Sequence, residues 1–291
     1  MFMPRKILEE KLLKLLAEDT AQGDVTTAAI IPSGKKAQAK IIAKEDAVAA
    51  GIEESAILAD ALELKIKTDV ADGDEISKDQ IIIRLSGDAQ TLLAAERTIL
   101  NLVSRMSGIA TTTKHLTEKL RNAGLNSRIA ATRKTAPGLS YFDKKSVLIG
   151  GGDPHRLHLD DMILIKDNHI AIIGSVEAAV RKAKENASFS KKIEVEVTRV
   201  EDVIVAAEAG ADVIMLDNFS PKRIREAVEW LERDSLRGKV ILEASGGISA
   251  QNIVDYGSTN VDVLSIGELT HSARAIDVSL EIVIENERKK K

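Results

Sequence analysis

Short apolar runs alternate with amphipathic segments through the second half of the chain. The apolar runs have the length of strands and end in polar or turn-forming residues, whereas the segments between them place apolar residues at helical spacing. The predicted strands cover residues 127–132, 161–166, 192–198, 212–218, 239–245 and 262–268. This alternation predicts a parallel sheet, either a closed or nearly closed barrel or a doubly wound open sheet.

Helix boundary signals support the same pattern. The segment SVEAAVRKAKENA opens with a serine suited to an N-cap, VEDVIVAAEAG ends at Gly210, and PKRIREAVEWLERD opens with Pro221. Serine caps the free amide groups of a first turn, proline fits that turn, and glycine tolerates the left-handed conformation that often ends a helix. Helices are therefore predicted between the strands.

The first part of the chain has a different character. Strand-like runs at 36–45, 64–70 and 81–87 precede a helical pattern at 89–106. The pattern changes near residue 110, which predicts an N-terminal domain over 1–110 and a second domain over 111–271. Arg97 lies on a polar line of the predicted helix, and spacing alone favours a solvated face for it.

Composition limits the kinds of function. With 291 residues, 44% hydrophobic and 30% charged, the chain suits two domains or a barrel with an added unit. Only 2% aromatic residues and a net charge of -4 argue against a nucleic-acid binder. The chain has no cysteine, and its N-terminal segment is too charged for a signal peptide or membrane span. We expect a cytoplasmic protein that binds no membrane.

Polar residues at the strand ends favour a barrel. The loops at the carboxyl ends of barrel strands converge on one centre, where active sites lie. In IEVEV, Glu194 and Glu196 share one face of the strand and the valines share the other, which predicts that both glutamates face the interior. For Glu194 an ion pair with Lys166 or Arg133 is an equal alternative to a site role. For Glu196 and Asp217 a site role is favoured.

Glycines after the last two predicted strands indicate an anion site. Ser245, Gly246 and Gly247 follow one strand, and Gly267 ends the next. Free backbone amides at such positions bind phosphate, and phosphate sites often use the last two strands of a barrel.

Basic residues gather in the segment between the first two barrel strands. These are Arg133, Lys134, His155, Arg156 and Lys166. In a chain of net negative charge they indicate a small ligand with more than one anionic group.

Nearby basic residues receive other interpretations. We expect Lys144 and Lys145 to lie in a solvated loop. His155, His158 and His169 could form a zinc cluster, but Arg156 and Lys166 would place cations beside the metal, so we do not favour it. His169 is expected to satisfy a local hydrogen bond.

Several motifs in fixed order resemble one enzyme family. They are GDVTT (23–27), AERTILNLVSRMSGIAT (95–111), ATRKT (131–135), GGGDPHR (150–156), LIKDNH (164–169), IEVEV (193–197), MLDN (215–218) and SGGI (245–248). Together they resemble the signature of the quinolinate phosphoribosyltransferases over nearly the whole chain. The resemblance implies an α/β fold, with an N-terminal α/β sandwich domain and an open, incomplete α/β barrel. It also suggests that a C-terminal helix over 272–291 joins the first domain.

The resemblance also implies a reaction and a site. The family converts quinolinate and phosphoribosyl pyrophosphate to nicotinate mononucleotide, pyrophosphate and CO2, with Mg2+ carried by the phosphoribosyl substrate. The implied quinolinate-binding residues are Arg133, Lys134, His155, Arg156, Lys166 and Arg97 from the partner subunit of a homodimer or hexamer. The implied phosphate and phosphoribosyl residues are Lys134, Lys166, Glu196, Asp217, Ser245, Gly246, Gly247 and Gly267. Lys166, Glu196 and Asp217 are the implied catalytic residues, and the two carboxylates reach the metal indirectly.

Three alternatives stay open at this point. A nicotinate-type phosphoribosyltransferase is the nearest, although nicotinate has one carboxylate and the basic set suits two. A barrel aldolase or isomerase would use Lys166 as a Schiff base or Glu196 as a general base. A non-catalytic relative of the family would keep the phosphate glycines and lose some basic residues.

Overall fold

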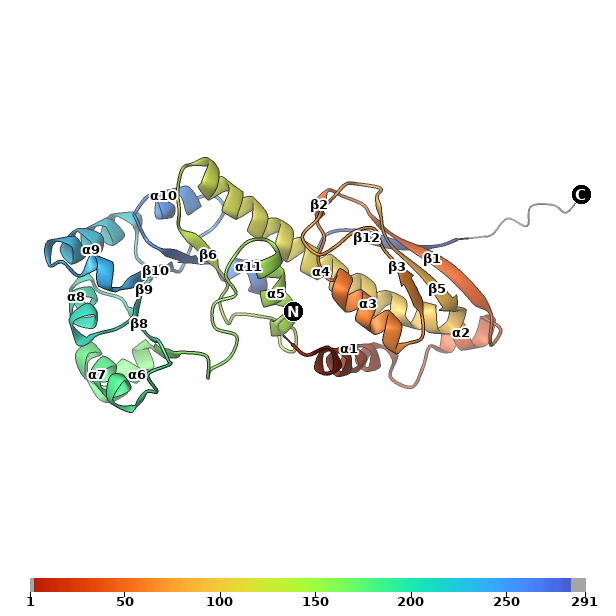
Figure 1. The fold of residues 1–291 in the computed structure, drawn as a ribbon, viewed down its shortest axis with the longest axis horizontal. Coiled ribbons are helices and arrows are strands. Elements are labelled where there is room, and N and C mark those ends of the chain that lie inside the picture. The colour runs from red at the N-terminus through yellow and green to blue at the C-terminus, as the bar shows by residue number, and fades with distance from the viewer. Residues whose placement is uncertain (1–2, 284–291) are drawn as a thin grey trace, which may run out of the picture. The chain divides into compact units, whose positions relative to one another are not determined.

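The protein consists of two compact units. One is made of two separate segments of the chain, and the other is a single continuous segment. A computed structural model describes residues 3–283. The first unit contains the described residues up to Thr112 together with those from Ala273 onward, and the second unit is Thr113–Ser272. Figure 1 colours the first unit red to yellow with a blue C-terminal strand, and the second unit green to blue. The second unit is thus inserted between two parts of the first.

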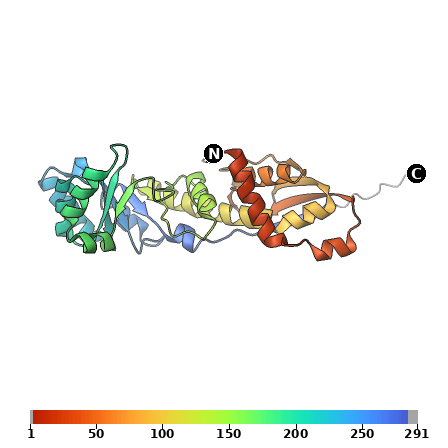
Figure 2. The same cartoon turned by 90° about the horizontal axis from the view of Figure 1, so that it is seen from below.

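The first unit is built on an antiparallel sheet with the strand order β12-β1-β5-β3. Helix α1 packs on helix α3 (Figure 2). The elements are α1 (Arg5–Thr20), α2 (Val25–Ile30), β1 (Lys36–Ala43), β2 (Ala47–Val48), α3 (Ile52–Ala61), β3 (Lys65–Lys67), β4 (Glu75–Ile76), β5 (Ile81–Asp88), α4 (Ala89–Asn122) and β12 (Val278–Ile282).

The sheet of the first unit has one apolar and one polar face. In the register of β1 with β5, Ile41 lies opposite Ile83 and both are fully buried, whereas Lys40 lies opposite Arg84. The period of two residues along a strand sends alternate side chains to opposite faces. The apolar face therefore forms the core of this unit.

The C-terminal segment corrects one prediction. The helix expected over 272–291 is wrong for the described part, because β12 (Val278–Ile282) is a strand that pairs antiparallel with β1. Val278, Leu280 and Ile282 alternate with polar residues, which is the period of a half-buried strand. Residues 284–291 of the predicted helix lie outside the described residues.

The second unit contains six parallel strands in the order β6-β11-β10-β9-β8-β7. Helices α7, α8 and α9 follow one another along the outside of the strands (Figure 1). The strands are β6 (Arg128–Ala130), β7 (Ile163–Ile165), β8 (Ile193–Val197), β9 (Val213–Asp217), β10 (Ile241–Ser245) and β11 (Val263–Ser265). The helices are α5 (Ser140–Ile149), α6 (Asp167–Ile173), α7 (Val176–Asn186), α8 (Val200–Ala209), α9 (Pro221–Arg233), α10 (Ile253–Gly257), α11 (Glu268–His271) and the 3-10 turn η1 (Arg237–Lys239).

The barrel is open between its first two strands. Strands β6 and β7 form the two edges of the six-stranded sheet and do not pair with each other. Helix α5 and the loop after it lie between β6 and β7 in the sequence. Asp153 of this loop makes a parallel bridge to Ala130 of β6. The predicted α/β class, with a sheet domain followed by a parallel α/β domain, is confirmed.

Helix α4 is longer than predicted. The pattern at 89–106 continues through the buried residues Ile109, Leu116 and Leu120, so the helix extends from Ala89 to Asn122. No helix of the described residues is both long and apolar enough to cross a membrane.

Gly108 allows the returning chain to reach the sheet of the first unit. A Cβ atom at this position would lie 1.8 Å from the carbonyl oxygen of Arg274, just before β12. We expect Gly108→Ala to destabilise the protein by about 1–3 kcal/mol, the usual cost of overpacking. Chemical denaturation followed by circular dichroism measures it. Gly238→Ala is the control, because a Cβ there has no heavy atom within 4 Å, and equal stability of the two variants would contradict the prediction.

Candidate active site

A cavity of about 520 Å³ lies at the carboxyl ends of the barrel strands. Its wall includes eight residues predicted from the sequence: Arg133, Lys134, His155, Arg156, Lys166, Glu196, Asp217 and Ser245. The wall is completed by Ala131, Thr132, Leu164, Met215, Asn218, Glu243 and Ser265. Each strand contributes its last residues or the loop that follows, as the parallel arrangement requires. Cations and carboxylates therefore face one shared space.

Lys166 and Glu196 form an ion pair on one side of the cavity. The Nζ atom of Lys166 donates to Oε2 of Glu196 at 2.6 Å. Lys166 follows β7 directly, and Glu196 lies on β8, the neighbouring strand. The Lys166 side chain is 44% exposed and that of Glu196 is 13% exposed. The pair thus keeps one ammonium and one carboxylate beside each other at the opening.

Asp217 is held at the end of β9 by its own neighbour. The Asn218 side-chain amide donates to Oδ2 of Asp217 at 2.8 Å, and the Asn218 backbone amide donates to the carbonyl of Ser245 at 2.8 Å. Asn218 adopts a left-handed conformation with φ 56°. A Cβ atom at Gly246 would lie 2.2 Å from the Asn218 amide oxygen, so this site requires glycine. The turn after β9 and the turn after β10 are therefore fitted to each other.

A smaller pocket of about 330 Å³ adjoins the cavity and shares Thr132, Lys134, Ser245 and Ser265 with it. Its remaining wall consists of Gly246, Gly247, Ile248, Ser249, Gly267, Glu268, His271 and Ser272. Backbone turns supply much of this wall, because glycine leaves the amide groups uncovered. The four residues predicted for phosphate lie together here, beside the Lys134 side chain.

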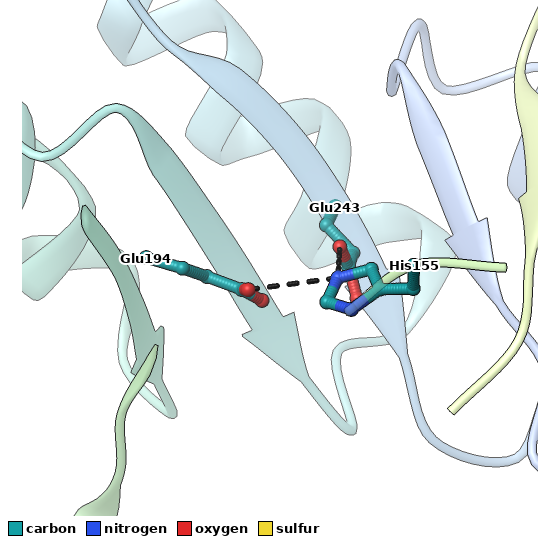
Figure 3. A group of neighbouring side chains, drawn as sticks. All are labelled: His155, Glu194 and Glu243. Atoms are coloured by element: carbon teal, nitrogen blue, oxygen red, sulfur yellow. Dashed lines mark hydrogen bonds and ion pairs between the residues drawn. The ribbon is translucent and has the colours of Figure 1, made fainter. Parts of the chain in front are cut away.

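One half-buried histidine and two buried glutamates form a cluster (Figure 3), and two of its members, His155 and Glu243, line the cavity. Nε2 of His155 is 3.1 Å from Oε2 of Glu243 and 3.5 Å from Oε2 of Glu194. The other oxygen of Glu243 accepts a hydrogen bond from the Ser265 hydroxyl at 2.6 Å. Neither oxygen of Glu194 has a hydrogen-bond partner among the described residues. An ion pair with Lys166 or Arg133 was one of the two alternatives for Glu194, and the structure pairs Glu194 with His155 instead.

Burial and charge shift the proton equilibria of this cluster. Desolvation, reinforced by the charge of Glu243, raises the pKa of Glu194 to about 8. Burial alone would lower the pKa of His155, but the hydrogen bond and charge of Glu243 and the charge of Glu194 raise it overall. Each of these two groups therefore keeps its proton to a higher pH than its ordinary pKa implies.

Two lysines and two histidines complete the comparison with the sequence predictions. Lys144 and Lys145 were expected in a solvated loop, which is wrong, since both are buried on α5 and burial lowers the pKa of Lys144 to about 8. His158 is exposed and does not join His155, so the three histidines form no cluster among the described residues. His169 Nδ1 accepts the backbone amide of Lys166 at 2.9 Å, which confirms its local role.

Arg97 lies in the first unit, on α4, and is exposed.

Sequence reasoning missed several residues of the site. Glu243 precedes Ser245 by two positions on β10, the same spacing that directed Glu194 and Glu196 inward, so the pattern held the signal. His271 lies one helical turn after Gly267, which the sequence also displays. Asn218 and Ser265 carry no such signal, because only the fitted turns and the strand register bring them to the cavity.

Two family descriptions match adjacent parts of the chain. "Quinolinate phosphoribosyl transferase, N-terminal domain" matches residues 24–107, and "Quinolinate phosphoribosyl transferase, C-terminal domain" matches residues 109–281.

Relatives match over nearly their full length. The "probable nicotinate-nucleotide pyrophosphorylase [carboxylating]" of Methanothermobacter thermautotrophicus is 48% identical over 92% of this chain and 96% of its own. The nicotinate-nucleotide pyrophosphorylase [carboxylating] of Mycobacterium leprae is 38% identical over 94% of this chain and 96% of its own. The solved nicotinate-nucleotide pyrophosphorylase from Francisella tularensis has a TM-score of 0.87 and 37% identity over 97% of this chain and 98% of its own.

The buried carboxyl of Glu194 predicts a pH-dependent cost to stability. In the folded state it keeps its proton up to about pH 8, whereas its ordinary pKa is 4.5. Between these values the folded state binds the additional proton, so this group lowers the free energy of unfolding as the pH rises, by at most about 1.4 kcal/mol per pH unit. We expect Glu194→Gln to gain stability relative to the unsubstituted protein on going from about pH 5 to about pH 8.

Chemical denaturation at several pH values in this range measures the difference. Glu208→Gln, an exposed position on α8, is the control and should show no such trend. A constant difference between Glu194→Gln and the unsubstituted protein across the range would contradict the prediction.

Proposed function

Because the chain belongs to the quinolinate phosphoribosyltransferase family, we propose that it transfers the phosphoribosyl group of phosphoribosyl pyrophosphate to quinolinate. The products are nicotinate mononucleotide, pyrophosphate and CO2, a step of de novo NAD biosynthesis. One observation carries the proposal: a cationic wall, two strand-end carboxylates and a glycine-lined pocket border one cavity. These parts suit a diacid, a ribose and a phosphate, respectively.

The cationic wall suits the two carboxylates of quinolinate. Arg133, His155 and Arg156 line one part of the cavity with Lys134 and Lys166. Guanidinium groups bind carboxylates with two parallel hydrogen bonds, which gives geometric selectivity as well as affinity. A ligand with one carboxylate would leave part of this positive charge without a partner. This supports quinolinate over nicotinate as the substrate.

The glycine-lined pocket suits the 5-phosphate of the second substrate. Ser245, Gly246, Gly247 and Gly267 offer backbone and hydroxyl donors, and Lys134 borders both this pocket and the cavity. An anion that accepts several backbone N–H groups is bound without an added charge from the protein. The ribose then extends from this pocket toward Glu196 and Asp217.

Glu196 and Asp217 suit the reacting carbon and the metal of the substrate. Departure of pyrophosphate leaves positive charge on the ribose ring near C1, and carboxylates positioned beforehand stabilise that charge. Carboxylate oxygens are also ligands of the kind that Mg2+ prefers, and Mg2+ arrives bound to the pyrophosphate group. Asp217 is oriented by Asn218 and Glu196 by Lys166, so both carboxylates are held before the substrate binds.

The second half of the reaction needs little further chemistry from the protein. Attack of the pyridine nitrogen on C1 makes that nitrogen cationic, and this positive charge stabilises the carbanion that remains when the adjacent carboxylate leaves as CO2. A proton from water then adds to this ring carbon and gives nicotinate mononucleotide. The main tasks of the protein are to orient the ring and neutralise charge. Lys166 lies at the rim next to Glu196, where its ammonium can contact the reacting carboxylate.

We extend the proposal to assembly and location. A homodimer or a hexamer of three dimers would share the site between subunits, with Arg97 supplied by the partner. The exposed position of Arg97 on α4 supports such a contact. The protein is proposed to act in the cytoplasm.

One assay tests the function directly. The protein is incubated with phosphoribosyl pyrophosphate, Mg2+ and either quinolinate or nicotinate, and CO2 and the mononucleotide are measured. We expect product with quinolinate and little or none with nicotinate. Failure to form a quinolinate-dependent product would overturn the proposal, and product from nicotinate alone would assign the nicotinate-type reaction instead.

Arg156→Ala tests the assignment of the cationic wall. We expect KM for quinolinate to rise by on the order of tenfold or more, because a charge-assisted contact to a carboxylate is lost. KM for phosphoribosyl pyrophosphate should change much less. Arg181→Ala, which removes an exposed arginine of α7, is the control. An equal rise in both KM values would contradict this division of roles.

Glu196→Gln tests the role of the strand-end carboxylates. Glutamine keeps the size of the side chain but removes the charge that stabilises the developing cation. We expect kcat to fall by on the order of 100-fold, the scale of losing one preorganised electrostatic group. Steady-state kinetics with both substrates saturating gives kcat, and an unchanged value would remove Glu196 from the mechanism.

A further inference from the structure

Lys144 is a buried cation that the proposed reaction does not use. It lies on α5, and its side chain is among the largest in the described chain with almost no exposed surface, at 1%. Burial of an ammonium group is costly unless its N–H groups find acceptors. The position of its acceptors therefore indicates what the residue does.

The Nζ atom of Lys144 contacts two backbone carbonyls on either side of one site residue. It donates to the carbonyl oxygen of Pro154 and, at 2.8 Å, to that of Arg156. These two carbonyls flank His155. The ammonium thus binds the turn that carries His155 and Arg156, both of which line the cavity.

This turn has a backbone conformation that needs outside support. His155 has φ 54°, in the left-handed region that is unfavourable for a non-glycine residue. Its backbone amide donates to Oδ1 of Asp153 at 2.7 Å. Asp153 and Lys144 together hold the turn, one through its amide and the other through its carbonyls.

The open edge of the barrel explains why a side chain is needed here. Asp153 still pairs with the edge of β6, since its amide donates to the carbonyl of Ile129 and its carbonyl accepts the amide of Ala131. After Asp153 the chain leaves this pairing, so the next carbonyls have no strand partner there. Buried carbonyls require donors. Lys144 supplies them from α5, the helix that precedes this turn in the chain.

We propose that Lys144 is a positioning residue of the quinolinate site, which fixes His155 and Arg156 by binding the carbonyls on both sides of His155. The inference rests on the proposed function only for the identity of the ligand. Lys144 acts through the backbone and does not contact the substrate. The glycine-lined pocket is formed by the ends of β10 and β11 and the segments after them, together with Thr132 and Lys134 after β6. None of these residues belongs to the turn that Lys144 binds.

Lys144→Met tests the proposal by kinetics. Methionine has a similar length and no donor. We expect KM for quinolinate to rise by on the order of tenfold, as when a charge-assisted contact is lost, with KM for phosphoribosyl pyrophosphate changed by less than about twofold. Lys182→Met, which removes the same charge from an exposed position on α7, should leave both KM values unchanged. Equal changes in both KM values, or none, would overturn the proposal.

A second measurement does not depend on the reaction. Hydrogen exchange of the peptide that spans 150–157 should be faster in Lys144→Met than in the unsubstituted protein, while peptides from α8 exchange at equal rates. Unchanged exchange across 150–157 would overturn the positioning role whatever the substrate is. If the unsubstituted protein has no activity on quinolinate, the proposed function fails and this exchange result still decides the inference.

Lys144→Arg keeps the proposal testable if Lys144→Met does not fold. Arginine retains the charge and the donors but moves them, so the turn should shift and KM for quinolinate should rise selectively, by less than in Lys144→Met where both can be measured. A folded Lys144→Arg protein with a loss shared equally between the two substrates would count against a positioning role.

Discussion

Two carboxylates on the inner face of the barrel sheet, Glu194 and Glu243, are almost completely buried and lie close enough to share one imidazole. A pair of buried like charges is unfavourable unless a cation or a proton reduces the net charge. On β9, the strand between β8 and β10, the residue in register with Glu243 is Met215, which carries no charge. The neutralising group has to enter from a loop, and the open edge of the barrel lets the segment after α5 bring His155 over them. The site above depends on this ionic arrangement.

The charges of the site are consequently layered. An acidic layer lies at the bottom, and the cations of the loops and strand ends lie above it, where the cavity opens. Arg156 is buried and Arg133 is exposed, so the cationic layer extends from the interior to the surface. The charge of Glu243 lowers the repulsion among these cations before any ligand binds. A dianionic ligand then enters a region in which several positive charges already lie close together, because their mutual electrostatic repulsion has been reduced.

Much of this organisation could be predicted from the sequence, for a physical reason. Along a strand every second residue faces inward, and parallel strands all end at one rim, so the strand ends and the IEVEV pattern placed Glu196 and Asp217 without knowledge of the fold. Lys144 could not be placed, because its two acceptors lie on the turn after α5, and only the folded structure brings that turn to the edge of β6. The C-terminal segment was assigned to a helix by family resemblance, although the alternation of Val278, Leu280 and Ile282 already indicated a strand. The alternation of apolar and polar residues predicted this segment better than the family resemblance did. Neither could predict contacts between residues that lie far apart in the sequence.

Because β12 pairs with β1, the sheet of the first unit lacks its outer strand until the second unit has been synthesised. The chain begins the first unit, makes the whole of the second, and returns only at the end to add the outer strand of the first sheet. During synthesis from the N-terminus, β1 therefore has an uncovered edge with free amide and carbonyl groups until Val278–Ile282 has been made. Such edges pair readily with other chains. All strands of the parallel barrel are made earlier, so the unit whose synthesis starts first is the last to have all its strands available.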